Sequence, residues 1–381
     1  MKVALIHDWL TGMRGGEKCL EVFCELFPNA DLYTLIYQED RISPTIRSMR
    51  HYSSWINQLP AVRKYYRHCL PLFPRTIEGF DLTGYDLVLS SSHCVAKGVV
   101  CPGGLHISYV YSPMRYIWDM HDAYFASDAS WISRTGIALC RRYLQHWDVL
   151  STERVDYLIA ISHHIAGKIR KIYNREAAVI HPPVDVDRFR LGERQEPYYL
   201  IVSALVPYKK INIAIEAFNR LKLPLKIAGE GPLRRRLEKQ ARPNVEFLGW
   251  VSDQALASLY AACQALVFPG EEDFGIVPLE AQASGRPVIA YGGGGALETI
   301  APLNRTGTTS PTGIFFDELT PESLIAAVQA FQQQRHHFDP AAIRRHSCRF
   351  SRDRFKVQIR DYIAACMREQ GLGELSDVKT P

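Results

Sequence analysis

Residues 267–291 read VFPGEEDFGIVPLEAQASGRPVIAY, and this stretch carries the strongest structural pattern in the chain. It continues an apolar segment, Ala265–Phe268, that predicts a buried strand. An acidic loop with glycine leads into a short helix, which we expect Pro278 to start and Gly285 to stop. A second apolar segment, Val288–Ala290, predicts another strand. The order strand, helix, strand is typical of a parallel sheet covered by helices.

Two glutamates, Glu272 and Glu280, flank this loop with seven residues between them. The first turn of the helix has N–H groups without intrahelical partners and the positive end of the helix dipole, and both suit a phosphate. The two carboxylates can accept hydrogen bonds from sugar or ribose hydroxyls. An ordinary acidic helix cap would need neither both glutamates nor Gly275 and Gly285 together. The stretch therefore predicts a site for a phosphate and a sugar.

The same stretch resembles the signature of the family-four retaining glycosyltransferases, which transfer a sugar from a nucleotide-sugar donor. In that family the first glutamate touches the donor sugar and the second holds the ribose. The resemblance carries these roles to Glu272 and Glu280, and makes Glu272 a candidate catalytic residue. The backbone amides that would touch the sugar and the phosphates belong to Phe274, Gly275, Ile276 and Val277.

Strand-like and helix-like segments alternate along the whole chain, which predicts the α/β class. With 381 residues, the chain is expected to form two domains of similar size. The double proline in His181-Pro-Pro-Val marks their boundary. The resemblance implies the GT-B fold, in which two doubly wound Rossmann-like domains face an interdomain cleft. Residues 1–182 would bind the acceptor, residues 190–349 the nucleotide sugar, and a helix within 350–381 would cross back to the first domain.

Local patterns predict the individual elements. The expected strands are Val3–Ile6, Leu87–Leu89, Ile107–Val110, Tyr157–Ile161, Tyr199–Val202, Leu225–Ala228, Val245–Phe247, Ala265–Phe268 and Val288–Ala290. The expected helices include Glu17–Phe27, Ile211–Leu221, Pro232–Gln240, Phe350–Glu369 and one that begins at Thr320-Pro-Glu.

The composition is that of a soluble globular protein, with 47% apolar and 22% charged residues. No run of roughly 18 apolar residues predicts a membrane-spanning helix, and Asp8 comes too early for the apolar core of a signal peptide. The nine cysteines contain no Cys-x-x-Cys pair, and most of them are expected to be buried thiols. These features predict a cytoplasmic protein.

Basic and aromatic residues alternate in residues 47–75, which we name the basic–aromatic segment. Its members are Arg47, Arg50, Tyr52, Trp55, Arg63, Lys64, Tyr65, Tyr66, Arg67, Phe73 and Arg75. Such a mixture is expected to attract an anionic membrane surface or a lipid-phosphate acceptor. It would place the protein peripherally on the inner face of the cytoplasmic membrane. The alternative is a solvated helix face whose aromatic rings belong to the core. No nucleic-acid partner is expected, because no recognised binding motif accompanies the segment.

Negative charge builds on the diphosphate when a sugar leaves it, so cations and helix N-termini are expected nearby. Lys209 follows a predicted strand and matches the family's phosphate-binding lysine, and Lys210 is a second candidate. The family has an arginine five residues before that lysine, whereas this chain has Ala204. One expected phosphate contact is therefore missing.

Two glycine-containing turns are further candidates for donor binding. Gly229 and Gly231 lie in a Gly-Glu-Gly-Pro turn that matches the family's turn near the nucleotide. Gly15 and Gly16 open the first predicted helix, where residues without side chains let the backbone approach a ligand closely. Family members use this loop near the donor phosphate and the acceptor.

The resemblance also implies a catalytic histidine in the first domain. His93 lies just after a predicted strand and is our candidate, with Lys97 as a nearby cation. Residues 107–119 (ISYVYSPMRYIWD) resemble a block of the O-antigen mannosyltransferase branch, in which a histidine often stands at the position of Tyr111. Tyrosine would be a poor base there, with a pKa of about 10. Arg115 and His121 are the spare candidates around the acceptor.

We expect no metal ion and no cofactor. The pair Asp185 and Asp187 could suggest a divalent-metal motif, but it follows the double proline, where the family has a similar non-catalytic sequence. Adjacent histidines, as in His163-His164 and His336-His337, point about 100° apart in a helix and make poor metal ligands.

Together, the resemblance implies a retaining transferase that moves mannose from GDP-mannose onto a lipid-linked saccharide for an O-antigen or exopolysaccharide. Another donor, such as UDP-glucose, UDP-GlcNAc or GDP-fucose, remains an alternative. So do a nucleotide-sugar epimerase on the same fold and a non-catalytic subunit that binds a sugar nucleotide. A dehydrogenase is not expected, because no Gly-x-Gly-x-x-Gly follows the first strand.

Overall fold

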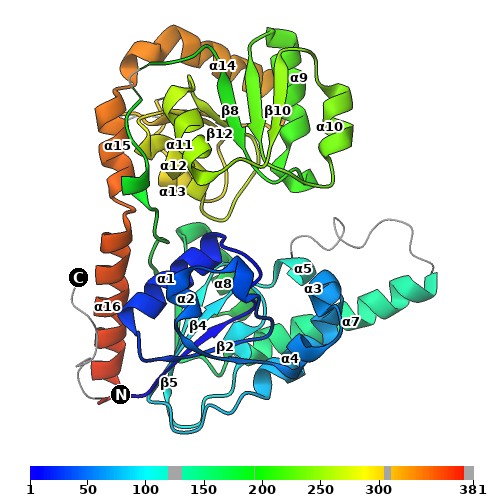
Figure 1. Cartoon of the computed structure of the whole chain (residues 1–381), viewed down its shortest axis with the longest axis vertical. Coiled ribbons are helices and arrows are strands. Elements are labelled where there is room, and N and C mark those ends of the chain that lie inside the picture. Colours follow the sequence, from blue (N-terminus) through cyan, green and yellow to red (C-terminus); the bar gives the residue numbers. More distant parts are fainter. Residues whose placement is uncertain (119–130, 193, 304–309, 373–381) are drawn as a thin grey trace. The chain divides into compact units, whose positions relative to one another are not determined.

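The computed structural model describes residues 1–118, 131–192, 194–303 and 310–372. The chain divides into two compact units, each built on one parallel sheet with helices packed against it (Figure 1). Unit 1 comprises Met1–Pro183 together with Asp353–Pro381, and unit 2 comprises Val184–Arg352. His121, a spare acceptor candidate, lies outside the described residues.

Unit 1 contains a seven-stranded sheet in the order β3-β2-β1-β4-β5-β6-β7, with every neighbouring pair parallel. Its strands are β1 (Val3–His7), β2 (Asp31–Thr34), β3 (Arg50–Ser53), β4 (Leu87–Ser92), β5 (Leu105–Val110), β6 (Tyr157–Ala160) and β7 (Ala178–Val179). Every residue of β1, β4 and β5 is buried, as expected for central strands of a sheet that is covered on both faces.

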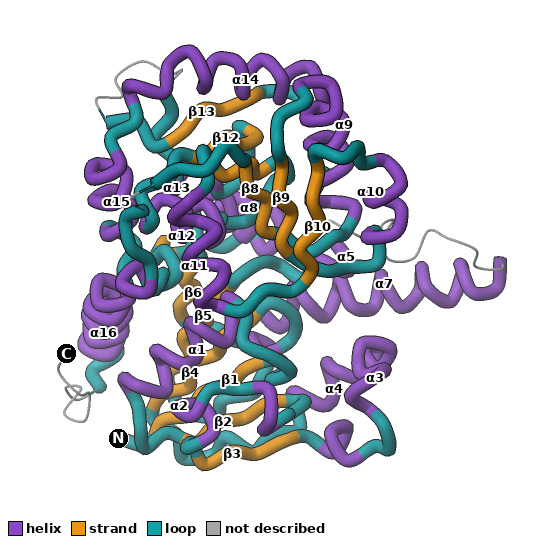
Figure 2. The backbone as a smooth tube through the Cα atoms, turned by 45° about the horizontal axis from the view of Figure 1, so that its top comes forward, coloured by secondary structure: helices purple, strands orange, loops and turns teal. Residues whose placement is uncertain are grey.

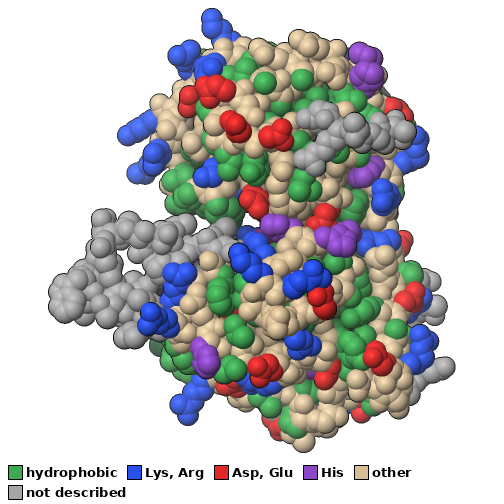
Figure 3. Space-filling view, turned by 180° about the vertical axis from the view of Figure 1, so that it is seen from behind, with side chains coloured by type: hydrophobic (Ala, Val, Ile, Leu, Met, Phe, Trp, Pro, Cys, Tyr) green, Lys and Arg blue, Asp and Glu red, His purple; other side chains and the backbone are tan. Residues whose placement is uncertain are grey.

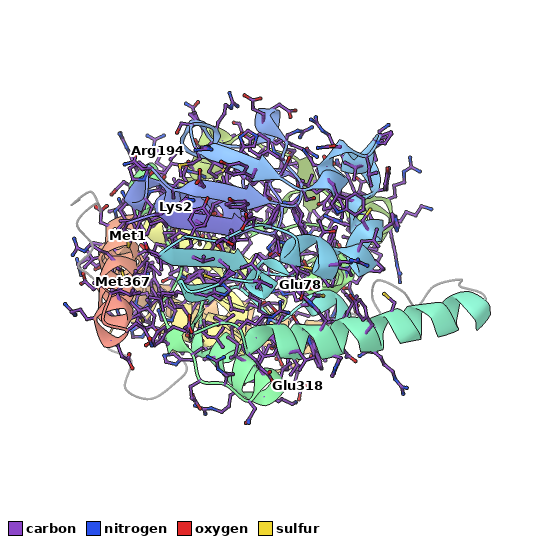
Figure 4. The ribbon with its side chains drawn as sticks, turned by 90° about the horizontal axis from the view of Figure 1, so that it is seen from below. Met1, Lys2, Glu78, Arg194, Glu318 and Met367 are labelled. Carbon is purple, nitrogen blue, oxygen red and sulfur yellow. The ribbon has the colours of Figure 1, made fainter. Side chains whose placement is uncertain are left out.

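The α-helices of unit 1 are α1 (Gly15–Leu26), α2 (Pro44–Arg47), α3 (Val62–Tyr65), α4 (Phe73–Glu78), α5 (Arg115–Trp118), α7 (Trp131–Thr152), α8 (His163–Tyr173) and α16 (Arg352–Glu369). Its 3₁₀ helices are η1 (Glu39–Arg41), η2 (Trp55–Gln58), η3 (Tyr66–Leu72) and η4 (Ala96–Gly98). Glu78 lies beside the C-terminal part of α7 (Figure 4), where it accepts hydrogen bonds from Trp147 Nε1 at 2.8 Å and from Arg154 Nη2 at 2.5 Å.

Helix α16 belongs to unit 1 although it lies at the far end of the described chain. Phe355 is fully buried, with its ring 5.8 Å from that of Phe23 and 5.6 Å from that of Tyr109. Lys356 forms an ion pair with Glu25 at 2.8 Å. An apolar anchor and a charged pair thus fix this helix on α1 and β5.

Unit 2 contains a six-stranded parallel sheet in the order β10-β9-β8-β11-β12-β13. Its strands are β8 (Tyr199–Val202), β9 (Leu225–Ala228), β10 (Val245–Gly249), β11 (Leu266–Phe268), β12 (Val288–Tyr291) and β13 (Gly313–Phe316). Its helices are η5 (Val186–Arg188), η6 (Pro207–Lys209), α9 (Ile211–Leu221), α10 (Arg234–Gln240), α11 (Asp253–Ala262), α12 (Ile276–Ala283), α13 (Ala296–Thr299), α14 (Pro321–Gln334), η7 (Arg335–His337) and α15 (Pro340–Cys348).

In both units the strand order reverses beside the first strand, as in doubly wound Rossmann-like sheets (Figure 2). This confirms the α/β class and the two doubly wound domains expected from the sequence. In such sheets, ligands bind outside the carboxyl ends of the strands near the reversal point. That point lies between β1 and β4 in unit 1 and between β8 and β11 in unit 2.

Each expected strand exists; Tyr199–Val202 and Leu225–Ala228 have the expected bounds, and the others differ by one to three residues at their ends. Strands β2, β3, β7 and β13 were not expected. Edge strand β3 is Arg-His-Tyr-Ser with two exposed and two half-buried residues, so it lacks an apolar pattern, and β7 has only two residues. The expected start of α12 at Pro278 is wrong by two residues, because the helix begins at Ile276. Pro278 fits in the first turn, where its missing N–H group costs no intrahelical hydrogen bond.

Within the part of the chain that the structure describes, no helix combines the length and the apolar character needed to cross a membrane.

Candidate functional site

In unit 2, the acidic loop before α12 is shaped by two close backbone contacts. Gly275 caps α12 with φ of 101°, a left-handed conformation that glycine adopts without strain. Behind the loop, a Cβ on Gly295 would lie 2.3 Å from Phe274 Cα, so only glycine fits there. Gly295 N also donates a hydrogen bond to Glu272 O at 2.7 Å. The loop is therefore held in one conformation at the carboxyl end of β11.

Glu272 and Lys209 form an ion pair at this end of the sheet. Lys209 is the last residue of η6, which follows β8, whereas Glu272 follows β11, the strand next to β8. Both side chains are mostly buried. Lys210 follows in a left-handed conformation and is half-buried. The strand order thus brings together the two residues that the sequence assigned to the sugar and to the diphosphate.

Glu280 lies within α12 and is 7% exposed. Its Oε2 accepts a hydrogen bond from the hydroxyl of Tyr260 at 3.0 Å. Burial, together with the charge of Glu280, raises the pKa of Tyr260 well above its ordinary value, so this hydroxyl remains a donor. Tyr260, on α11, was missed in the sequence, because only the packing of α11 against α12 brings it to Glu280.

The turn Gly229–Gly231 lies at the carboxyl end of β9, as its sequence position implies. Gly229 N donates to Gly249 O at 2.7 Å, which joins this turn to the end of β10. Trp250 follows Gly249, and its side chain is 77% exposed. An exposed aromatic ring can stack on a planar ligand group. No local sequence pattern marks Trp250 as a site residue.

In unit 1, His93 and Asp8 meet at the carboxyl ends of β4 and β1. The side chain of His93 is 28% exposed, and its Nδ1 lies 3.1 Å from Asp8 Oδ2. Asp8 is fully buried. His93, the candidate catalytic residue, therefore stands on the edge where a ligand is expected in a doubly wound sheet.

Lys97, expected as a nearby cation, is instead part of the core and is 1% exposed. Its Nζ lies 2.5 Å from Asp148 Oδ1 and 3.2 Å from Ser151 Oγ. The other oxygen of Asp148 accepts hydrogen bonds from Trp118 Nε1 and the Tyr173 hydroxyl, both at 2.8 Å. The charge of Lys97 is neutralised inside the fold, so Lys97 does not act as a cation beside His93.

Tyr111 connects three strands to the first turn of α1. Its hydroxyl donates to Gly16 O at 2.9 Å and lies 2.8 Å from Ser91 Oγ, which lies 3.1 Å from His7 Nδ1. Since the tyrosine proton goes to a carbonyl, the Ser91 hydroxyl donates to Tyr111 and accepts from Nδ1–H of His7. Burial raises the pKa of Tyr111 well above its ordinary value. Tyr111 is therefore a structural link, and a proton acceptor at this position is not available.

Gly15 and Gly16 form the first residues of α1. The carboxylate of Glu17, in the same turn, accepts a hydrogen bond from Arg14 N at 3.0 Å. Burial raises the pKa of Glu17. Arg115, a spare candidate, is half-buried at the start of α5.

Asp185 and Asp187 are both exposed; Asp185 precedes the short helix η5, and Asp187 lies within it. Within the described ranges, no group of three or more His, Cys, Asp or Glu side chains is arranged to hold a metal ion.

The basic–aromatic segment exposes most of its cations, whereas several of its rings belong to the core. Tyr66 and Phe73 are buried, but Trp55 and the neighbouring Leu72 are about half exposed. Arg63 and Lys64 are exposed on α3. On the face shown in Figure 3, Lys and Arg side chains are spread over the surface with Asp and Glu among them.

The fold just described is shared with solved glycosyltransferase structures of the GT-B type. One of them is HepE from Anabaena in complex with UDP, which superposes with a TM-score of 0.68 over 96% of this chain and 100% of HepE. The two sequences are 16% identical, so the likeness shows the fold alone.

The sequence of unit 2 is similar to a known family. Residues 184–345 match the model of the family Glycosyl transferases group 1. The GDP-mannose-dependent alpha-mannosyltransferase of Mycobacterium tuberculosis is 35% identical over 162 residues, which is 39% of this chain and 42% of that protein. The O-antigen chain mannosyltransferase RfbU of Salmonella typhimurium is 30% identical over 156 residues, 37% of this chain and 43% of that protein. The chain thus spans less than half the length of these curated relatives.

Proposed function

We propose that the protein is a retaining glycosyltransferase that moves mannose from GDP-mannose onto a lipid-linked saccharide during synthesis of a surface polysaccharide. The observation that carries the proposal is the arrangement in unit 2. The N-terminus of α12 begins between Glu272 and Glu280, and Lys209 lies at the same loop. The mannosyltransferases among the relatives support the choice of donor.

In the proposed reaction, the acceptor hydroxyl attacks the anomeric carbon while the bond from that carbon to the phosphate oxygen breaks. The proton of the acceptor passes to the leaving phosphate on the same face of the sugar, which retains the configuration. Lys209 and the N-terminus of α12 stabilise the charge that develops on the diphosphate.

The remaining residues bind and orient the donor. Glu272 accepts hydrogen bonds from the sugar hydroxyls, and Glu280 holds the ribose, with its carboxylate fixed by Tyr260. His93 contacts a hydroxyl of the sugar near the reaction centre. Positive charge from Lys209 and from the helix is proposed to serve where other glycosyltransferases use a divalent metal.

The donor is tested by incubating the protein with GDP-mannose, GDP-fucose, UDP-glucose and UDP-GlcNAc and following slow hydrolysis to the nucleotide. We expect hydrolysis of GDP-mannose to be fastest. A preference for a UDP-sugar would refute the mannose donor. Conversion to an epimeric nucleotide sugar without release of the nucleotide would instead identify an epimerase. Binding without turnover, even with the native acceptor, would identify a non-catalytic subunit.

A lipid-linked acceptor requires the protein to work at a membrane, and we propose that the basic–aromatic segment binds anionic lipid on the inner face of the cytoplasmic membrane. The same segment contains exposed cations and the half-exposed side chains of Trp55 and Leu72. This supports the proposal, because lysine and arginine attract anionic headgroups and the apolar side chains can enter the interface.

Sedimentation with vesicles of phosphatidylglycerol and phosphatidylcholine at low salt tests the membrane proposal. The double substitution Arg63→Glu and Lys64→Glu should abolish cosedimentation. The matched control, Arg235→Glu with Arg236→Glu on α10 of unit 2, reverses the same number of exposed charges and should leave it unchanged. Equal loss in both variants would show that only net charge matters, and would refute a specific surface.

A further inference from the structure

Asp8 lies at the carboxyl end of the unit 1 sheet, and its carboxylate accepts four backbone hydrogen bonds. It directly follows β1 and is fully buried. Its Oδ1 accepts from the backbone N–H groups of Val95 at 2.6 Å and Ala96 at 2.8 Å. Its Oδ2 accepts from those of His93 at 2.7 Å and Cys94 at 3.0 Å. The Nδ1 atom of the His93 ring is a fifth neighbour, 3.1 Å from the same Oδ2.

These contacts determine the protonation of the Asp8 carboxyl group and of the His93 ring nitrogens. Four backbone N–H groups can only donate, so the carboxyl group is an ionised acceptor on both oxygens. Although burial alone would raise it, the charge and the hydrogen bond of His93 lower the pKa of Asp8 below its ordinary value. A carboxylate that only accepts requires a proton on His93 Nδ1. When the ring is neutral, the other nitrogen, Nε2, must then carry the lone pair.

The ring of His93 is also held from its sides. The ring of Trp9 lies edge-on to it, with centroids 4.4 Å apart and an interplanar angle of 89°. The rings of His7 and Tyr111 follow at 5.9 and 6.4 Å. Because Nδ1 faces a buried carboxylate, Nε2 lies on the edge of the ring that faces away from Asp8. The side chain of His93 is 28% exposed.

We propose that Asp8 is a positioning residue, which fixes the orientation and the Nδ1–H tautomer of His93 so that Nε2 is the atom that meets a hydroxyl of the bound sugar or acceptor. A neutral Nε2 accepts the hydrogen bond of such a hydroxyl and, in the protonated ring, donates one to its oxygen. The functional half of this inference rests on the proposed glycosyl transfer. The assignment of the tautomer does not, because it rests on the contact between His93 Nδ1 and the Asp8 carboxylate.

The competing explanation is that Asp8 only caps the backbone turn 93–96, with His93 packed beside it by chance. In that case the ring would not need one tautomer, because the four backbone hydrogen bonds already satisfy the carboxylate. The state of the ring nitrogens therefore separates a positioning role from a purely structural one.

The first experiment measures the tautomer in the whole protein labelled with ¹⁵N-histidine. Long-range ¹H–¹⁵N correlation spectra are recorded while the pH is raised until the His93 ring is neutral. Its signals are identified by their loss in His93→Gln, with His68→Gln, an exposed residue of η3, as the control. We expect a protonated Nδ1 and an unprotonated Nε2. An Nε2–H tautomer, or a mixture in exchange, would overturn the proposal.

The second experiment compares two isosteres of the histidine. The amide of asparagine in His93→Asn reaches the position of Nδ1 and can still donate to Asp8, but it leaves the Nε2 position empty. The amide of glutamine in His93→Gln reaches the Nε2 position and loses the bond to Asp8. We expect His93→Asn to unfold at the same temperature as the wild type, while kcat falls roughly 100-fold or more and the KM for the donor is little changed. We expect His93→Gln to unfold at a lower temperature than His93→Asn.

The outcomes separate the two proposals. A wild-type kcat in His93→Asn would overturn the role of Nε2, whatever the tautomer is. If no donor is turned over by the wild type, the proposed transfer fails, but the tautomer and the unfolding temperatures still test Asp8. Asp8→Asn should lower kcat like His93→Asn. Asp8→Asn also loses backbone hydrogen bonds. If this variant does not fold, the comparison of His93→Asn with His93→Gln tests the proposal instead.

Discussion

Replacing Lys97 by methionine should destabilise unit 1 more than any surface substitution, because it leaves a buried carboxylate without its counter-ion. The ammonium group contacts Asp148 at 2.5 Å and Ser151 at 3.2 Å, and both Lys97 and Asp148 are essentially inaccessible to solvent. Removing one partner of a buried ion pair costs about 3–5 kcal/mol. Methionine keeps most of the length of the lysine stem, so little of this cost arises from an empty cavity.

For a domain of this size, about 3–5 kcal/mol corresponds to a decrease in Tm of roughly 6–20 °C. Differential scanning calorimetry measures Tm, and tryptophan fluorescence reports on unit 1 through Trp147, whose ring lies 5.4 Å from Lys97 Nζ. Lys64→Met, an exposed lysine of α3, is the matched control and should leave Tm unchanged.

A double-mutant cycle identifies the cause. Asp148→Asn removes the charge that Lys97→Met leaves unpaired, and its side-chain oxygen can still accept from Trp118 or Tyr173. The double variant should therefore be more stable than Lys97→Met alone. A decrease below about 1 kcal/mol in Lys97→Met, which is the size of a surface pair, would refute the buried-charge argument. So would a double variant that is less stable than the single one.

Three further predictions concern unit 2. Gly295→Ala should lower its stability by about 1–3 kcal/mol and weaken nucleotide binding in calorimetric titrations, because the new methyl group would meet Phe274 Cα at 2.3 Å. If the stability of unit 2 and the nucleotide affinity both kept their wild-type values, the loop would accommodate the methyl group without a loss of free energy. Tyr260→Phe should weaken GDP binding less than Glu280→Gln does, since it removes only the group that orients the carboxylate, and the opposite order would refute the role of Glu280. Ala204→Arg, at an exposed position, should tighten GDP binding about tenfold by restoring one charged contact, and unchanged affinity would place the diphosphate elsewhere.

The central part of each sheet could be predicted from sequence because its strands are buried and contain apolar runs, as in Val3–Ile6 of β1. The acidic loop and α12 could be predicted for a similar reason, since all of their features lie within one short stretch. Strand β3 could not be, because it lies at an edge and its side chains are polar and partly exposed. Periodicity detects strands that are buried, and this one is not.

The partners of the site residues were harder to predict, because they come from distant parts of the chain. Asp8 and His93 are adjacent only because β1 pairs with β4. Tyr260 reaches Glu280 from another helix. Lys97 illustrates the opposite error: its sequence position near His93 suggests a solvent-exposed cation, whereas α7 supplies the carboxylate that neutralises it. Local sequence identifies which residue types a site contains, and the strand order decides which of them meet.

The position of α16 has a consequence for the order in which the polypeptide can mature on the ribosome. Unit 2 is contiguous, from Val184 to Arg352, whereas unit 1 is interrupted by it and is completed by the segment that begins at Asp353. Domains generally fold as units, and N-terminal ones first. The space that Phe355 fills between Phe23 and Tyr109 therefore stays empty until α16 has been synthesised. Synthesis of unit 1 begins before that of unit 2, but unit 1 is completed after it. The apolar surface of unit 1 that contacts α16 remains exposed while unit 2 is synthesised.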